Sequence, residues 1–161
     1  NVSIYEGVGL SKIVERNSLP AMTSYEIALA DKFAEFLFTQ NQIVLPTHHT
    51  IHAGVYYRTI ALKKDEIVCG VLIKIPTTVI IHGAADVYIG SEVIKARGTS
   101  VIPANGGRKQ VVMAIENVTI TMCFKTDAKT IAEAEEEFTD EFDLLQSRTP
   151  MGKNTYNITE V

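Results

Sequence analysis

The chain of 161 residues has no tryptophan, two cysteines and four histidines. Cys69 and Cys123 each lie in an apolar run, where a free thiol acts as a small hydrophobic side chain, so we expect two reduced core residues and no disulfide framework. No run approaches the roughly 20 apolar residues that cross a bilayer. The formal charge is -4, which gives no general attraction to nucleic acid or anionic lipid. The sequence therefore predicts no membrane contact and argues against a nucleic-acid partner.

The length and the 46% apolar content are typical of one globular domain. Within residues 1–45, Thr23 and Glu26 match a capping box at the start of a helix, and Pro20 suits its entry. Apolar residues then recur at intervals of three and four: Ile27, Ala30, Phe33, Ala34 and Leu37. We predict an N-terminal arm followed by an amphipathic helix that packs on the rest of the domain or on a second subunit.

Residues 46–125 have the pattern of short strands. Runs rich in β-branched residues are separated by polar or glycine-containing breaks, and the runs are 55–62, 67–75, 78–81, 86–89, 92–96, 100–102, 110–115 and 118–124. Among the breaks are His82-Gly83 and Arg97-Gly98. About eight strands without a helix-length pattern between them predict an antiparallel sandwich, jelly roll or barrel.

Residues 126–148 predict a second amphipathic helix, since Thr130 and Glu133 form another capping box. Its remaining surface is acidic: Glu133, Glu135, Glu136, Glu137, Asp140, Glu141 and Asp143. We expect a solvated face there, with a metal-binding carboxylate cluster as the alternative. Residues 149–161 predict a mobile or partner-dependent tail.

Four stretches resemble small cupin-like proteins encoded by tailed bacteriophages, namely residues 47–54, 74–77, 103–110 and 137–141. The resemblance covers about residues 43–148. It implies a mainly β fold, a cupin-like (RmlC-like) antiparallel β-barrel or jelly roll with one N-terminal and one C-terminal helix. It also implies a phage or prophage origin, in the cytoplasm of an infected bacterium or in the virion. It does not imply a reaction.

Metal-binding cupins resemble one another in two motifs that together supply several histidines and a glutamate. Here the window of the first motif, residues 70–90, contains His82 and no glutamate, and no histidine follows His82. We therefore favour no metal cofactor. The alternative is a divalent metal held by a non-standard set, His49, His52 and His82, with His48 beside it, in a loop that enters a strand.

Cationic residues suggest a second kind of site. Arg58 and Lys74 interrupt apolar strands, and Arg108 and Lys109 follow a glycine pair. If they faced the mouth of the barrel, they would bind a small anionic ligand, with Thr77 and Gln110 as neutral hydrogen-bonding groups. The alternative is that these cations form ion pairs with Glu66, Asp86, Glu92 or the acidic helix.

No catalytic motif is present, so the catalytic residues stay unassigned and an enzyme is disfavoured. The runs 67–75 and 78–81 are apolar on both faces, so we expect the terminal helices or a second copy of the chain to cover the face outside the barrel. We predict a non-catalytic, oligomeric structural, accessory or binding protein, with phage, host or small anionic partners. A metal-dependent small-molecule enzyme is the alternative.

Overall fold

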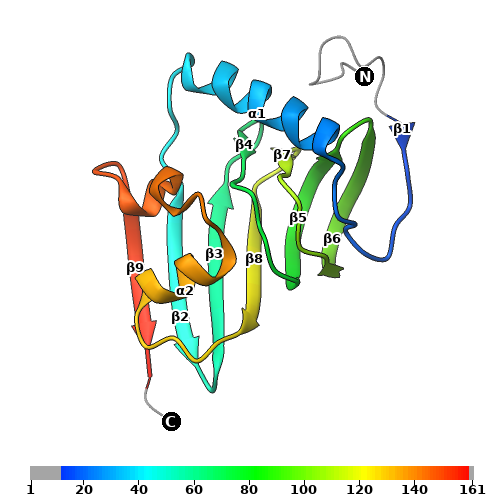
Figure 1. Ribbon diagram of the computed structural model, residues 1–161. Coiled ribbons are helices and arrows are strands. Elements are labelled where there is room, and N and C mark those ends of the chain that lie inside the picture. Colours follow the sequence, from blue (N-terminus) through cyan, green and yellow to red (C-terminus); the bar gives the residue numbers. More distant parts are fainter. Residues whose placement is uncertain (1–11, 160–161) are drawn as a thin grey trace.

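The computed structural model describes residues 12–159. The mainly β prediction is confirmed, since this part of the chain contains nine strands and two α-helices (Figure 1). The elements are β1 (Lys12–Ile13), α1 (Ser24–Phe38), β2 (Pro46–His52), β3 (Val55–Leu62), β4 (Ile67–Cys69), β5 (Thr77–Ile89), β6 (Glu92–Ala104), β7 (Val111–Ala114), β8 (Val118–Lys125), α2 (Ile131–Phe138) and β9 (Lys153–Ile158), with 3-10 turns at Phe142–Leu144 and Gln146–Arg148.

The strands form one sheet that turns back on itself. Strands β6, β5, β8, β3 and β2 are antiparallel neighbours in that order, and β1 and β9 add parallel strands at the two edges. Residues 78–82 of β5 pair with β8, whereas residues 85–88 pair with β7, which pairs in turn with β4. The sheet therefore has two walls. The large wall consists of β6, β5, β8, β3, β2 and β9, the small wall contains β7 and β4, and β5 runs through both.

Two glycines mark the place where β5 changes partner. Gly83 and Gly98 lie opposite each other in the β5–β6 hairpin, and both have positive φ angles, +123° and +78°. A Cβ atom at Gly83 would lie 2.5 Å from the backbone oxygen of Asn117. Residues other than glycine rarely adopt such φ values, so this pair allows the long hairpin to serve both walls.

The large wall has an inner and an outer face, because successive side chains of a strand point to opposite sides. In β3, Tyr56 is fully buried, whereas the neighbouring Tyr57 is 36% exposed. Tyr56 packs under α2 with Phe124 and Phe138. The core between the walls includes Val79, Ile81, Val87 and Val112 among others.

Both helices begin where the capping boxes predict a helix. Thr23 and Glu26 form the expected reciprocal bonds at α1, and Thr130 caps α2 through the backbone N–H of Glu133. In Figure 1, α1 lies across the upper ends of the strands and α2 lies in front of β2 and β3.

The C-terminal part of the chain differs from the prediction. Helix α2 ends at Phe138, because Thr139 is extended, and two 3-10 turns replace the expected helix up to residue 148. Residues 153–158 are not a mobile tail: they form β9, in register with β2 from Pro46 to Ile51. The six residues of β9 are mostly polar and exposed, which explains the weak sequence signal.

Three strand predictions are also corrected. The histidine segment forms strand β2 instead of a loop, and the run 67–75 is strand only at Ile67–Cys69. The pairs of short runs on either side of Gly83 and of Gly98 are the continuous strands β5 and β6. The expected arm at residues 1–11 lies outside the described residues.

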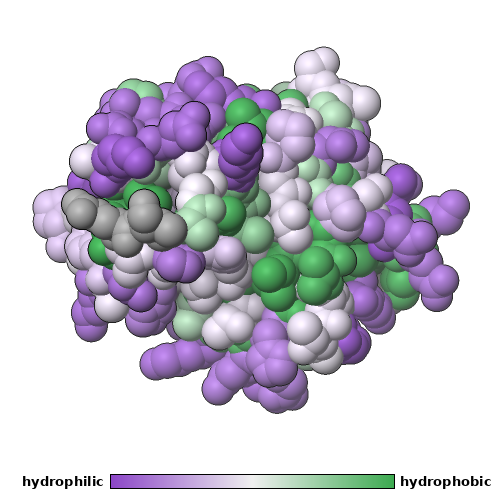
Figure 2. Space-filling model, turned by 90° about the horizontal axis from the view of Figure 1, so that it is seen from below, coloured by the Kyte–Doolittle hydropathy of each residue, from purple (hydrophilic) through white to green (hydrophobic). Residues whose placement is uncertain are grey.

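Within residues 12–159, no helix is long and apolar enough to span a membrane. Several large hydrophobic side chains nevertheless reach the surface, among them Val101 at 65% exposure and Tyr156 at 58%. Figure 2 shows the molecule from below, with a hydrophobic area right of centre and smaller ones elsewhere on a mostly polar surface.

Candidate functional site

A cavity of about 590 Å³ lies between the two walls. The large wall contributes Ile60, Val79, Ile120 and Met122, and the small wall contributes Val68 and Val112. The last turns of α1 and the segment 40–45 close its upper side, and Phe138 of α2 lies at another side. A volume in this range and a mainly apolar wall are typical of small-molecule sites.

Arg108 is the most unusual residue of the cavity wall. Its side chain is 1% exposed, and its guanidinium donates to the oxygens of Asn105 and Thr77, each at 2.6 Å, and to Gln110 Oε1 at 3.3 Å. All of these acceptors are neutral. Burial lowers the pKa of Arg108 to about 10, so the group is still charged at neutral pH.

Gln110 contributes the second unusual group. Its side-chain oxygen accepts from Arg108, while its Nε2 atom is buried and has no hydrogen-bond partner among the described residues. A buried donor without an acceptor costs about 1–3 kcal/mol. Arg108 and Gln110 therefore place an excess of hydrogen-bond donors in the wall of the cavity.

Arg58 also lines the cavity, but its charge is balanced. Its Nη1 atom lies 2.8 Å from Glu135 Oε2, and Glu135 is only 3% exposed. Burial alone would raise the pKa of Glu135, but bonds from Ser147, Arg148 and Arg58 lower it, so the carboxylate stays ionised. The expectation of a wholly solvated acidic face is therefore wrong at Glu135.

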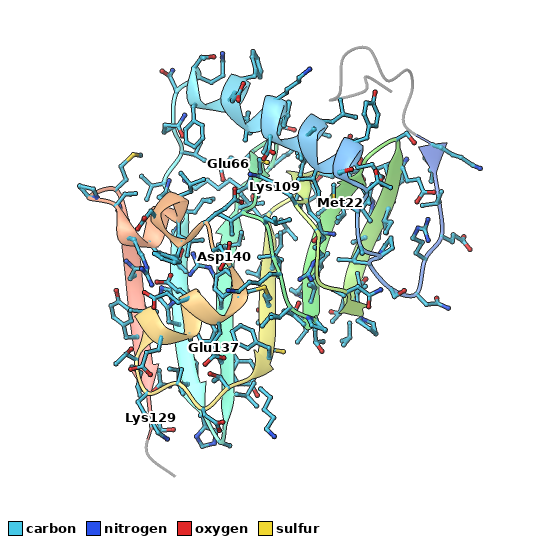
Figure 3. The ribbon with its side chains drawn as sticks, in the orientation of Figure 1. Met22, Glu66, Lys109, Lys129, Glu137 and Asp140 are labelled. Atoms are coloured by element: carbon cyan, nitrogen blue, oxygen red, sulfur yellow. The ribbon has the colours of Figure 1, made fainter. Side chains whose placement is uncertain are left out.

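The other two predicted cations lie away from the cavity wall. Lys74 forms an exposed ion pair with Asp140, 2.6 Å apart. Lys109 lies beneath α1 beside Met22 (Figure 3) and binds Asp31 at 2.7 Å and Glu141 at 3.3 Å. Burial alone would lower the pKa of Lys109, but these two carboxylates raise it. Of the predicted anion-binding residues, the structure brings together Thr77, Arg108 and Gln110.

The histidines lie in separate places. His49 points into the molecule, where Nδ1 lies 2.8 Å from the Tyr56 hydroxyl and Nε2 lies 2.8 Å from Asn154 Oδ1. His52 is exposed and contacts Thr159, and His82 contacts Thr99 on β6. In the described part of the chain, no group of three or more His, Cys, Asp or Glu residues could hold a metal ion.

Two residues that bind predicted site residues could not be identified from the sequence. Glu135 belongs to a run of acidic residues, and only the fold shows that it faces Arg58 and Arg148 instead of solvent. Asn154 is one of several polar residues near the C-terminus, and only the pairing of β9 with β2 places it beside His49.

Comparisons with known proteins give a distant resemblance only. No protein-family model matches the chain, and no curated protein matches it. Solved structures that resemble it include a cupin-2 domain containing protein from Shewanella frigidimarina, with 13% identity over 58% of this chain and 91% of that chain and a TM-score of 0.42. A cupin superfamily protein from Desulfitobacterium hafniense has 12% identity over 71% of this chain and 100% of that chain, with a TM-score of 0.45.

A further similar structure is the cupin-2 domain of an XRE family transcriptional regulator from Enterobacter cloacae, with 9% identity over 53% of this chain and 100% of that domain and a TM-score of 0.43. These neighbours are consistently cupin barrels. Similarities at this level assign neither a family nor a function to the chain.

Proposed function

We propose that this chain is a small-molecule-binding protein whose site is the cavity between its two walls. The single observation that carries the proposal is the presence of an unpartnered buried donor, Gln110 Nε2, in the wall of a cavity of about 590 Å³. Buried polar groups in proteins nearly always have a hydrogen-bond partner. A ligand that accepts a hydrogen bond from Gln110 Nε2 would therefore remove the free-energy cost of this unpartnered donor.

The chemistry of the cavity supports binding in preference to catalysis. Cys69 lines the cavity, but burial raises the pKa of its thiol to about 11, so it is protonated at neutral pH and a poor nucleophile. Arg58 is neutralised by Glu135, and no histidine lines the cavity among the described residues. The wall thus offers hydrogen-bond donors and apolar surface, which are the means of binding.

The test is a titration with the neutral dye Nile red, whose fluorescence rises in apolar surroundings. Ile120→Phe adds volume at the cavity wall and is expected to lower dye affinity at least tenfold. Thr119→Phe places the same side chain at the next residue of β8, which is exposed on the outer face, and is expected to bind like the wild type. Equal affinity of all three proteins, or no fluorescence increase with any of them, would refute binding in the cavity.

We propose in addition that the protein self-associates through the outer face of the large wall. Two cross-strand rows on this face contain no Lys, Arg, Asp or Glu, and they consist of Val101, Ile80, Thr121, Thr59, His48 and Thr155, and of Pro103, Thr78, Cys123, Tyr57, Thr50 and Asn157. Two rows across six strands cover about 400 Å². A stable interface uses about 800 Å² from each partner, so the two rows would supply about half of the area that a second copy needs.

Native mass spectrometry tests the self-association. Val101→Lys introduces a charge at the β6 end of one row, at a side chain that is 65% exposed, and is expected to give monomers, whereas Tyr25→Lys, equally exposed on α1, is expected to leave the oligomer intact. A wild-type monomer at micromolar concentration would refute the proposal.

A role as an accessory or structural component of a tailed bacteriophage is a further proposal, supported by the resemblance in sequence alone.

A further inference from the structure

The charge of Arg108 has no counter-ion in the described part of the chain. Its acceptors are the Asn105 and Ile75 carbonyls, the Thr77 hydroxyl and the Gln110 amide oxygen. By contrast, the buried ends of Arg58 and Lys109 each contact a carboxylate within 2.8 Å. An ion taken out of water without an opposite charge costs several kcal/mol, so the folded protein without ligand carries this cost at Arg108.

Donors remain free beside this charge. A guanidinium has five N–H groups. The four hydrogen bonds above use one on Nε, two on Nη1 and one on Nη2, which leaves the second N–H of Nη2 without an acceptor among the described residues. Gln110 Nε2 is the neighbouring free donor. One positive charge and two adjacent donor groups match the single charge and two oxygens of a carboxylate.

We infer that the ligand of the cavity is a monocarboxylate with an apolar body, bound by Arg108 and Gln110. This inference rests on the proposed function, and it adds the chemical class of the ligand. The apolar body would lie against Ile60, Val79, Val112 and Ile120.

The cavity disfavours ligands with more than one negative charge. A phosphate monoester carries about 1.5 to 2 negative charges at pH 7. Among the described residues of the lining, Arg108 alone supplies a positive charge without a carboxylate partner, and the acidic residues Asp65 and Glu66 also line the cavity. The second charge of a phosphate or dicarboxylate would therefore be buried without a partner or would face these two carboxylates.

Three probes with the same eight-carbon chain separate the contributions in isothermal titration calorimetry: octanoate, 1-octanol and octyl phosphate. Octanoate is expected to bind at least tenfold more tightly than the other two. The apolar chain alone gives the affinity of 1-octanol, and Arg108 and Gln110 give the remainder.

Gln110→Glu is the decisive variant, because it has nearly the same shape and supplies the missing counter-ion inside the protein. The side-chain oxygen of residue 110 already lies 3.3 Å from Arg108 Nε. The variant is expected to lose octanoate affinity at least tenfold, to keep its affinity for 1-octanol and to melt at a higher temperature than the ligand-free wild type. Asn17→Asp makes the same change from an amide to a carboxylate at an exposed residue outside the cavity lining, and is expected to change octanoate affinity less than threefold.

The outcomes separate the two proposals. Equal affinities for octanoate and 1-octanol in the wild type, unchanged in Gln110→Glu, would overturn the carboxylate inference and leave binding in the cavity standing. Tighter binding of octyl phosphate than of octanoate would also overturn it. If none of the three probes binds and Nile red fluorescence does not rise, the proposed function itself fails.

Discussion

His49 and Asn154 lie 105 residues apart in the sequence, yet Nε2 of the imidazole is 2.8 Å from Oδ1 of the amide. The Asn154 amide nitrogen donates to the carbonyl of Ser147, so its oxygen faces the imidazole and accepts the Nε2 proton. Nδ1 of His49 then accepts from the Tyr56 hydroxyl, which is 2.8 Å away. This chain of bonds fixes a neutral histidine and ties β9 to β2 and β3.

Stability is expected to fall as the pH is lowered below about 6.5, the ordinary pKa of histidine. Burial lowers the pKa of His49 in the folded protein. Below pH 6.5 the unfolded chain therefore binds a proton that the folded chain does not, and the free energy of unfolding drops by up to about 1.4 kcal/mol per pH unit until the folded pKa is reached. Urea unfolding between pH 7.5 and pH 5 measures this slope.

The neighbouring histidine gives the control for this pH dependence. His48→Gln, on the exposed face of the same strand, is expected to keep the slope, whereas His49→Gln is expected to remove it between pH 5 and pH 6.5. An equal slope in both variants would assign the pH dependence to other groups.

The C-terminal strand is expected to depend on Asn154 more than on its other polar residues. Asn154→Ala removes the acceptor of His49 and the donor to Ser147, which we expect to cost about 1–3 kcal/mol of unfolding free energy. Asn157→Ala changes the same residue type at an exposed place on β9, and we expect a change within about 0.5 kcal/mol. Thermal and urea unfolding of both variants measure the difference, and equal losses would contradict this role of Asn154.

The sequence predicts strands inside the sheet and misses the strand at its C-terminal edge. Strands β3 and β8 are indicated by their content of apolar and β-branched residues, and each has a strand neighbour on both sides. Strand β9 is mostly polar and exposed, and it pairs with residues of β2 that lie 107 positions earlier in the chain, so no local pattern indicates it. Gly83 and Gly98 read as breaks between strands, although each lies inside a continuous strand and only their pairing shows the bend.

The sequence also predicts part of the candidate site. Arg108 and Thr77 are polar residues beside apolar strands, which marks them as candidates in the sequence. In the structure Arg108 Nη2 donates to Thr77 Oγ1 at 2.6 Å. The sequence does not show which cationic side chains form ion pairs. Glu135 and Glu141, the partners of Arg58 and Lys109, belong to the C-terminal part of the chain, which packs back on the barrel. The residue without a counter-ion is therefore identifiable only from the fold.

Substitution of the two paired glycines is expected to have unequal effects. Gly98→Ala meets no atom within 4 Å, so we expect only the strain of a positive φ, about 1–2 kcal/mol. Gly83→Ala adds a clash with the Asn117 carbonyl to a φ of +123°, and we expect a loss above about 3 kcal/mol. Urea unfolding of both variants measures the two costs. A smaller loss for Gly83→Ala than for Gly98→Ala would contradict the close approach of β5 to the start of β8.

The ionised Glu135 is expected to hold α2 and the segment after it against the barrel. It contacts Arg58 on β3 and Arg148 in the last 3-10 turn, at 2.8 and 2.9 Å. Glu135→Gln removes the charge and leaves two arginines repelling each other in a mostly buried place, for which we expect a loss of about 3 kcal/mol. Glu136→Gln makes the same change one residue later, at a side chain that is 51% exposed, and we expect less than about 1 kcal/mol. Urea unfolding at pH 7 compares the two variants, and similar losses would show that the Arg58–Glu135 pair contributes little to stability.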